Sequence, residues 1–241
     1  ASSNRYLPFD IKKNEIPYLK SNVVEYMFEP GSVIKPISFS ILLDREKISP
    51  YELVNGNHGS FKIGKKIITD EHQFGWLSAE DVIVHSSNIG MAKLAQKFDG
   101  SHFHNQLIKF GFTQKLNIRL SNQQLGSIPT KEQLSSKIYK AVTSYGYGMD
   151  VNFIQILRAY NIFNNNGKRI EPYLVDYIQT PKGEISLRKD NKAISVIQAK
   201  TAKMMRKILV KTVNKGTGRG AITKGIEVGG KTGTAHIAIN G

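Results

Sequence analysis

The stretch EPGSVIKP at residues 29–36, continued by the apolar run ISFSILL at 37–43, determines what fold this chain can adopt. Apolar residues recur at helical spacing from Ser32 onward, which predicts a largely buried helix. Proline is tolerated near a helix start, where few backbone N–H groups have partners, so Pro36 predicts that the helix begins close to Ser32. A serine is thereby expected at a helix N-terminus, with a lysine three residues later.

This arrangement suits nucleophilic catalysis. A serine hydroxyl is a weak nucleophile until a base removes its proton, and Lys35 shares a helix face with Ser32. Burial and a second nearby cation both lower a lysine pKa, which would leave the amine neutral and able to accept that proton. Backbone N–H groups at the helix N-terminus would face a developing oxyanion. Because S-x-x-K is common by chance, the interpretation needs support from elsewhere in the chain.

Composition limits the class of protein. The chain has 241 residues, is 40 % apolar and has no cysteine, so it can form a substantial core but no disulfide, thiolate zinc site or cysteine nucleophile. The formal charge of +15 would suit nucleic acid, acidic lipid or cell-wall polymer. The basic residues are scattered, without interleaved aromatics, which argues against nucleic-acid binding. No apolar run is long enough for a membrane span. The first residues, ASSNRYLPFD, have neither an initiator methionine nor an apolar signal core, so we expect a piece of a longer protein.

Further helices and hairpins follow from periodicity and turn residues. A capping pair, Ser78 with Asp81, should begin a helix, and Gly111 should end another. The predicted elements are a hairpin over 61–69, helices over 89–98, 103–110, 151–163 and 197–213, a hairpin over 173–187, and a strand over 226–239. The pattern predicts an α+β protein in which a helical middle section interrupts a sheet-forming periphery.

Two more motifs complete a signature. Ser86-Ser87-Asn88 lies in the expected turn between two helices, and Lys231-Thr232-Gly233-Thr234 lies on the expected last strand. S-x-x-K, S-x-N and K-T-G in this order are typical of penicillin-binding proteins and class A β-lactamases. The chain resembles the transpeptidase domain of a class B penicillin-binding protein. The flanking sequences HSSNIGMAKLA, SYGYGMDV, GTGRGAI and VGGKTGTA extend the resemblance over nearly the whole chain, and SSNIGM and SYGYG make it most similar to the septal type.

The resemblance implies a penicillin-binding/serine β-lactamase-like fold. It has an antiparallel sheet flanked by helices plus a mainly helical lobe, here truncated after the K-T-G strand. Residues 1–241 would form one incomplete transpeptidase domain, with a sheet-side lobe at about 1–31 and 168–241 and a helical lobe at about 32–167. The family also implies an N-terminal membrane anchor absent from this chain, a location on the periplasmic side of the inner membrane, and divisome membrane proteins as partners.

Roles for individual residues are also implied by the resemblance. Ser32 would attack the penultimate D-Ala carbonyl of a stem pentapeptide, and Lys35 would take its proton. Ser86 would relay a proton to the leaving amine, Asn88 would orient the substrate amide and Lys35, and Lys231 would hold Ser86. Thr232, Gly233 and Thr234 would bind the substrate, and the N–H groups of Ser32 and Thr234 would form the oxyanion hole. β-Lactams would acylate Ser32; no cofactor or metal is implied.

The same motifs are compatible with other enzyme classes. A D,D-carboxypeptidase would use water as acceptor, and a penicillin-binding sensor or scaffold would turn over little. A class A β-lactamase needs a glutamate motif that the chain does not show. Residues 225–232 also match G-x-x-x-x-G-K-T, but a phosphate-binding loop needs a helix starting at the lysine, and none is expected here.

Three histidines and four aromatic residues are further candidates for site or core positions. His85, His102 and His104 fit no zinc-site spacing. Trp76 and Phe74 are expected in the core, and Tyr145 and Tyr147 could either line a cleft or pack under a turn.

Overall fold

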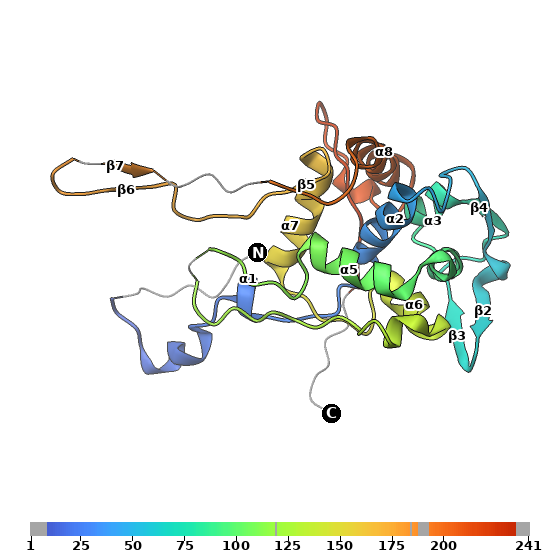
Figure 1. The fold of residues 1–241 in the computed structure, drawn as a ribbon, viewed down its shortest axis with the longest axis horizontal. Coiled ribbons are helices and arrows are strands. Elements are labelled where there is room, and N and C mark those ends of the chain that lie inside the picture. The colour runs from blue at the N-terminus through green and yellow to red at the C-terminus, as the bar shows by residue number, and fades with distance from the viewer. Residues whose placement is uncertain (1–8, 119, 184, 188–192, 235–241) are drawn as a thin grey trace.

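The computed structural model describes residues 9–118, 120–183, 185–187 and 193–234 (Figure 1). The α-helices are α1 (Asn22–Glu25), α2 (Lys35–Asp44), α3 (Ala79–Val84), α4 (Asn88–Leu94), α5 (Gly100–Phe110), α6 (Lys137–Ser144), α7 (Phe153–Asn164) and α8 (Ala199–Lys215). The 3-10 helices are η1 (Lys13–Tyr18), η2 (Gly31–Ile34), η3 (Asn57–Gly59), η4 (Ala95–Lys97), η5 (Gln133–Ser135) and η6 (Arg219–Ala221). The strands are β1 (Leu53–Asn55), β2 (Ser60–Ile63), β3 (Lys66–Thr69), β4 (Trp76–Ser78), β5 (Lys168–Arg169), β6 (Tyr177–Gln179), β7 (Ile185–Leu187) and β8 (Ile194–Ser195).

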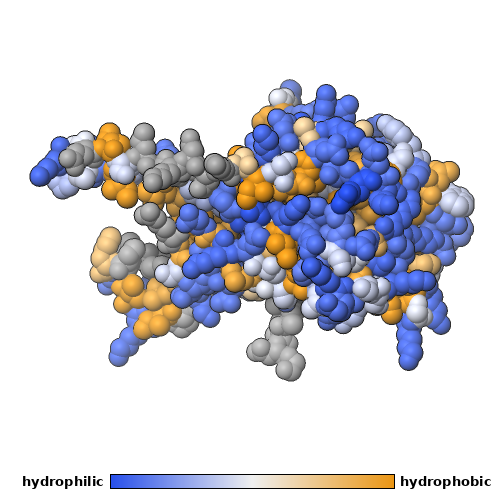
Figure 2. Space-filling model, in the orientation of Figure 1, coloured by the Kyte–Doolittle hydropathy of each residue, from blue (hydrophilic) through white to orange (hydrophobic). Residues whose placement is uncertain are grey.

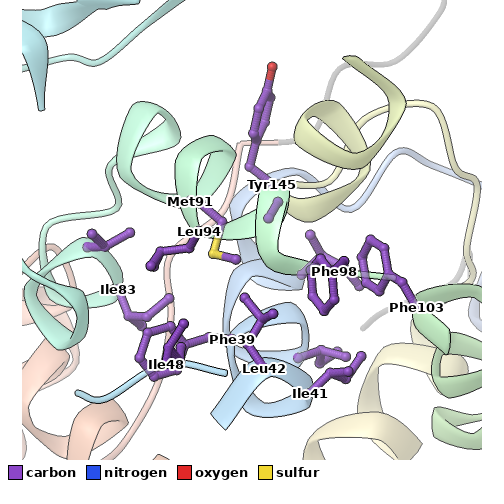
Figure 3. Packing of buried hydrophobic residues seen from close by; sticks show 14 of the residues in the cluster. Phe39, Ile41, Leu42, Ile48, Ile83, Met91, Leu94, Phe98, Phe103 and Tyr145 are labelled. Atoms are coloured by element: carbon purple, nitrogen blue, oxygen red, sulfur yellow. The ribbon is translucent and has the colours of Figure 1, made fainter. Parts of the chain in front are cut away.

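Helix α2 forms the centre of the core. Every residue from Lys35 to Leu42 is buried, as expected for a helix that is apolar nearly all round. Figure 3 shows Phe39, Ile41 and Leu42 of α2 packed together with side chains from α3, α4 and α5. Truncating a buried residue of this size typically lowers the free energy of unfolding by about 2–5 kcal/mol. Helix α2 is therefore a firm support for the residues of its first turn.

The strands form four separate antiparallel pairs, and the α+β class is confirmed. Strand β1 pairs with β4, β2 with β3, β5 with β8 and β6 with β7. Both predicted hairpins are present. Strands β2 and β3 cover residues 60–69, one residue more than the predicted 61–69, and β6 and β7 lie within the predicted 173–187. The β6–β7 hairpin extends away from the helical body (Figure 1), and Figure 2 shows hydrophobic surface on it. Tyr177 and Ile178 of β6 are both exposed.

Local sequence explains where the helices begin and end. The Ser78 hydroxyl accepts a hydrogen bond from the Asp81 N–H at 3.2 Å, which confirms the predicted cap of α3. Helix α5 ends at Gly111, whose φ of 107° is readily available only to glycine. Helix α7 begins two residues later than predicted, because Asn152 and Gln155 form a capping box.

Two predictions about the periphery were wrong. Of the strand expected over 226–239, residues 235–239 lie outside the described residues, and 227–234 form no strand. A strand needs a pairing partner, and here Gly230 N–H donates to the Leu209 carbonyl of α8 at 3.2 Å instead. Trp76, expected in the core, is 67 % exposed, because alternation along β4 turns its neighbour Leu77 inward.

The division of the chain into a sheet-side lobe and a helical lobe stays a prediction. Within the described ranges, no helix combines the length and the apolar character that crossing a bilayer requires.

Candidate active site

Ser32 lies on a tight turn immediately before α2. The prediction that the α-helix itself begins near Ser32 was wrong by three residues, because residues 31–34 form a 3-10 turn and the α-helix begins at Lys35. Pro36 explains the difference, since it has no N–H to donate to the Ser32 carbonyl; the Lys35 N–H donates there instead. Ser32 is partly exposed, whereas Lys35 directly below it is fully buried.

The Lys35 amine contacts the second motif. Its Nζ donates to the Ser86 carbonyl oxygen at 2.5 Å and lies 3.2 Å from the Ser86 hydroxyl. Burial lowers the pKa of Lys35 well below its ordinary value, the nearby Lys231 ammonium lowers it further, and Asp70 and Glu71 oppose the shift. A lysine in this environment loses its proton easily, as a general base requires.

Ser86 has an unusual backbone conformation. Its φ is 61°, in the left-handed region that non-glycine residues rarely occupy. The next residue, Ser87, is buried and caps α4 by accepting from Gly90 N–H at 2.8 Å. Asn88, expected to orient Lys35, directs its side-chain amide to the Thr69 carbonyl at 3.0 Å. The predicted turn between two helices is therefore present, and it presents Ser86 to Lys35.

The third motif lies against the Ser32 turn. A Cβ added to Gly31 would overlap the Thr234 carbonyl oxygen, and one added to Gly233 would lie 2.6 Å from Val33 Cγ1. Residues 231–234 therefore run directly beside the turn that carries Ser32, and glycine allows this close approach on both segments.

The side chains of the third motif are oriented among themselves. Lys231 Nζ donates to the carbonyl oxygen of Thr232 at 2.8 Å and lies 3.2 Å from its hydroxyl, whereas the resemblance implied that it holds Ser86. Burial lowers the pKa of Lys231 to about 8. The Thr232 hydroxyl donates to the Thr217 hydroxyl at 2.9 Å. Lys231, Thr232 and Thr234 thus lie on a segment beside the Ser32 turn, and a lysine with two threonines suits an anionic group such as a carboxylate.

The SYGYG segment is hydrogen-bonded to the segment that carries Ser32. Gly31 N–H donates to the Gly146 carbonyl at 3.0 Å, and Gly148 N–H donates to Glu29 Oε1 at 2.8 Å. Tyr145 is 5 % exposed and lies edge-on to Tyr147, so Tyr145 mainly packs under the turn. Figure 3 shows its hydroxyl pointing away from the core cluster. The two segments EPG and SYGYG, far apart in sequence, thus form one support.

The histidines have local roles. His102 contacts the Arg45 guanidinium at 3.3 Å, and His104 Nδ1 lies 2.9 Å from the Pro129 carbonyl. Among the described residues, no three side chains of the metal-ligating types gather into a site.

The whole chain, residues 1–241, matches the family described as the penicillin binding protein transpeptidase domain. The chain belongs to this family. It is 29 % identical over 223 residues to the probable peptidoglycan D,D-transpeptidase PenA of Neisseria flavescens, which covers 92 % of this chain and 52 % of that protein. This penicillin-binding protein domain therefore spans about half the length of that relative.

Solved structures agree with the family assignment. The transpeptidase domain of Burkholderia pseudomallei penicillin-binding protein 3 is similar with a TM-score of 0.83 and 30 % identity, covering 92 % of this chain and 65 % of that one. Penicillin-binding protein 3 of Mycobacterium tuberculosis, solved with aztreonam and with ampicillin, is similar with a TM-score of 0.76 and 27 % identity, covering 83 % of this chain and 44 % of that one. The penicillin-binding protein fold is therefore shared with both.

Sequence reasoning missed three residues that support this penicillin-binding protein site. Glu29 and Gly146 hold the Ser32 turn, and Asp70 binds the second motif. Glu29 and Gly146 stand inside stretches that the resemblance quoted, so they could have been suspected. Asp70 stands in none of the motifs, and only the fold shows its position.

Proposed function

We propose that this domain is a peptidoglycan D,D-transpeptidase that cross-links stem peptides through an acyl-enzyme on Ser32. The observation that carries the proposal is the buried Lys35 amine, one turn from Ser32 and 2.5 Å from the Ser86 carbonyl oxygen. Burial favours the neutral amine, and a neutral amine beside a serine hydroxyl is the base that nucleophilic attack needs.

Acylation would proceed in two proton transfers. Ser32 Oγ attacks the carbonyl carbon of the penultimate D-Ala while Lys35 takes the hydroxyl proton, giving a tetrahedral oxyanion and a lysine ammonium. The N–H groups of Ser32 and Thr234, on adjacent segments, would stabilise that oxyanion. The C–N bond then breaks, and the terminal D-Ala nitrogen receives a proton through Ser86, which lies 3.2 Å from Lys35 Nζ. D-Ala leaves, and the acyl-enzyme remains.

The third motif would recognise the substrate. Lys231, Thr232 and Thr234 would bind the carboxylate of the terminal D-Ala, with Gly233 allowing the segment to approach the nucleophile, and Asn88 would bind the substrate amide. In the second half-reaction, the amine of a neighbouring stem peptide attacks the ester carbonyl, the Ser32 Oγ–C bond breaks, and the proton of the amine returns to Ser32. The products are a cross-link and free enzyme.

The location and partners are part of the same proposal. The motifs SSNIGM and SYGYG favour the septal branch, in which the domain would work on the periplasmic side of the inner membrane within a longer, anchored protein bound to divisome membrane proteins. β-Lactams would acylate Ser32, because a strained lactam carbonyl can replace the D-Ala-D-Ala amide. The M. tuberculosis relative solved with aztreonam and ampicillin supports this part.

Fluorescent penicillin tests the proposal. The wild-type protein should label covalently, and Ser32→Ala should not. Ser38→Ala is the matched control, because Ser38 is buried on the same helix and its hydroxyl has no partner among the described residues; it should label like wild type. Labelling of Ser32→Ala would overturn the assignment. A stem pentapeptide offered with an acceptor amine should yield the cross-linked product, and release of D-Ala with hydrolysis alone would indicate a carboxypeptidase.

A further inference from the structure

Asp70 makes an unusual set of hydrogen bonds with the second motif. Its Oδ2 accepts from the Ser87 hydroxyl at 2.5 Å, and its Oδ1 accepts from the backbone N–H groups of Asn88 at 2.5 Å and Ile89 at 3.1 Å. One carboxylate therefore binds three donors on three consecutive residues. Hydrogen bonds to a charged acceptor are roughly twice as strong as hydrogen bonds between neutral groups.

Asp70 is itself held in place by the β2–β3 hairpin. It follows the last residue of β3, and its N–H donates to the Gly59 carbonyl at 3.2 Å. The Asn88 amide donates to the Thr69 carbonyl, so the hairpin end is attached to the start of α4 through two successive residues. Ile63 and Ile68 of the hairpin are buried in the core, which makes this anchor rigid.

This anchor lies next to Ser86 and acts on its backbone conformation. The left-handed conformation of Ser86 is strained and persists only where the surroundings impose it. On one side Ser86 is bound by Lys35, and on the other side the next three residues are bound by Asp70. Without the carboxylate, the turn could relax and withdraw both Ser86 oxygens from the Lys35 amine.

We propose that Asp70 is a positioning residue for acylation, which holds Ser86 in the strained conformation where its carbonyl and hydroxyl oxygens meet Lys35. This inference rests on the proposed function. Asp70 acts through Ser86, because its carboxylate binds the three residues that follow Ser86. A displacement of about 1 Å in a catalytic group can cost about 100-fold in rate, so even a small shift of Ser86 should be visible in the acylation rate.

The charge of Asp70 gives a second readout. The charged groups that act on Lys35 are Lys231, which lowers its pKa, and Asp70 and Glu71, which raise it. Removal of the Asp70 charge should therefore lower the Lys35 pKa further. Because the neutral amine is the active form, the acid side of the acylation pH profile should move to lower pH in Asp70→Asn. A purely structural defect would lower the rate without moving the profile.

The test measures the acylation rate with fluorescent penicillin, together with the melting temperature. Asp70→Ala should reduce the rate by about 10- to 100-fold. Asp70→Asn keeps an acceptor for the two N–H groups, so it should lose less and show the shifted profile. Asp99→Ala is the matched control, because Asp99 caps α5 by accepting from His102 N–H at 2.7 Å, outside the three motifs. It should lose stability but keep the wild-type rate.

The outcomes are distinguishable. If the wild-type protein does not label, the proposed function fails, whatever the variants do. If it labels and Asp70→Ala acylates at the wild-type rate, the positioning role is overturned. A rate loss that Asp99→Ala shares, with no change in the pH profile of Asp70→Asn, would also overturn it, because the effect would then be general destabilisation.

Discussion

The two sides of the candidate site differ in how they are built. Lys35 and Ser86 lie on and beside core helices, with Lys35 fully buried, whereas Thr232, Gly233 and Thr234 are exposed on an extended segment without a strand partner among the described residues. Proton transfer needs a dry environment that lowers the lysine pKa, and the helical core supplies it. Recognition of an anion needs access from solvent, and the open segment offers that.

Because the two sides are built differently, the chemical step and the recognition of the carboxylate should respond separately to substitution. Changes to the buried side should mainly reduce the chemical step, and changes to the open side should mainly weaken binding of the carboxylate.

Loss of the Lys35 amine should have the largest effect. Lys35→Met keeps an unbranched buried chain and removes the proposed base, so the acylation rate should fall by about 1000-fold. Fluorescent penicillin labelling over time measures this. Lys140→Met is the control, because Lys140 donates to the Phe98 carbonyl at 3.1 Å, outside the motifs. A Lys35→Met rate within tenfold of wild type would contradict the role of Lys35 as base.

Gly146 tests the support behind the Ser32 turn. A Cβ there would overlap the Gly31 carbonyl oxygen, and its φ is 99°, so Gly146→Ala should destabilise the fold by about 2–4 kcal/mol and reduce acylation. Gly148→Ala is the matched control, because its φ is also positive but nothing lies within 4 Å. Thermal unfolding compares the two; equal losses of stability would show that the contact with Gly31 is unimportant.

The lowered pKa of Lys231 predicts that acylation depends on pH through the exposed side of the site. Its pKa is lowered to about 8, so its ammonium is present below this pH and is lost as the pH rises through it. Acylation by a β-lactam that carries a carboxylate should therefore weaken above about pH 8, by up to roughly tenfold, as a charge-assisted contact is lost. The same antibiotic as a carboxylate ester should show no such decline, and a decline shared by both compounds would refute the assignment to Lys231.

The contact between Thr232 and Thr217 should have the smallest effect. Thr217→Val removes the acceptor of the Thr232 hydroxyl, which should reduce acylation efficiency by roughly 2- to 10-fold, the value of one exposed hydrogen bond. The melting temperature should not change. Thr223→Val is the control, since the Thr223 hydroxyl donates to the nearby Ala221 carbonyl at 3.3 Å, outside the three motifs. A drop in efficiency for both variants would point to the loop as a whole.

The sequence predicted most helices and both hairpins because their patterns are local. The cap at Ser78, the stop at Gly111 and the apolar run of α2 each depend on residues a few positions apart. The expected strand over 226–239 failed in its described part because a strand depends on a partner, and partners are set by the fold. The prediction that Trp76 lies in the core failed because its exposure depends on which face of β4 is turned outward.

By itself, the sequence determined the three motifs, their order and the identity of the nucleophile candidate, because residue types and short spacings carry that information. Only the tertiary structure decided how the motifs meet. It bound Lys35 to Ser86 across 51 positions, placed Thr234 against Gly31, and put Asp70 under the second motif. Burial, close backbone approach and strain at Ser86 arise only when distant segments pack, and these decide the pKa and position of each group.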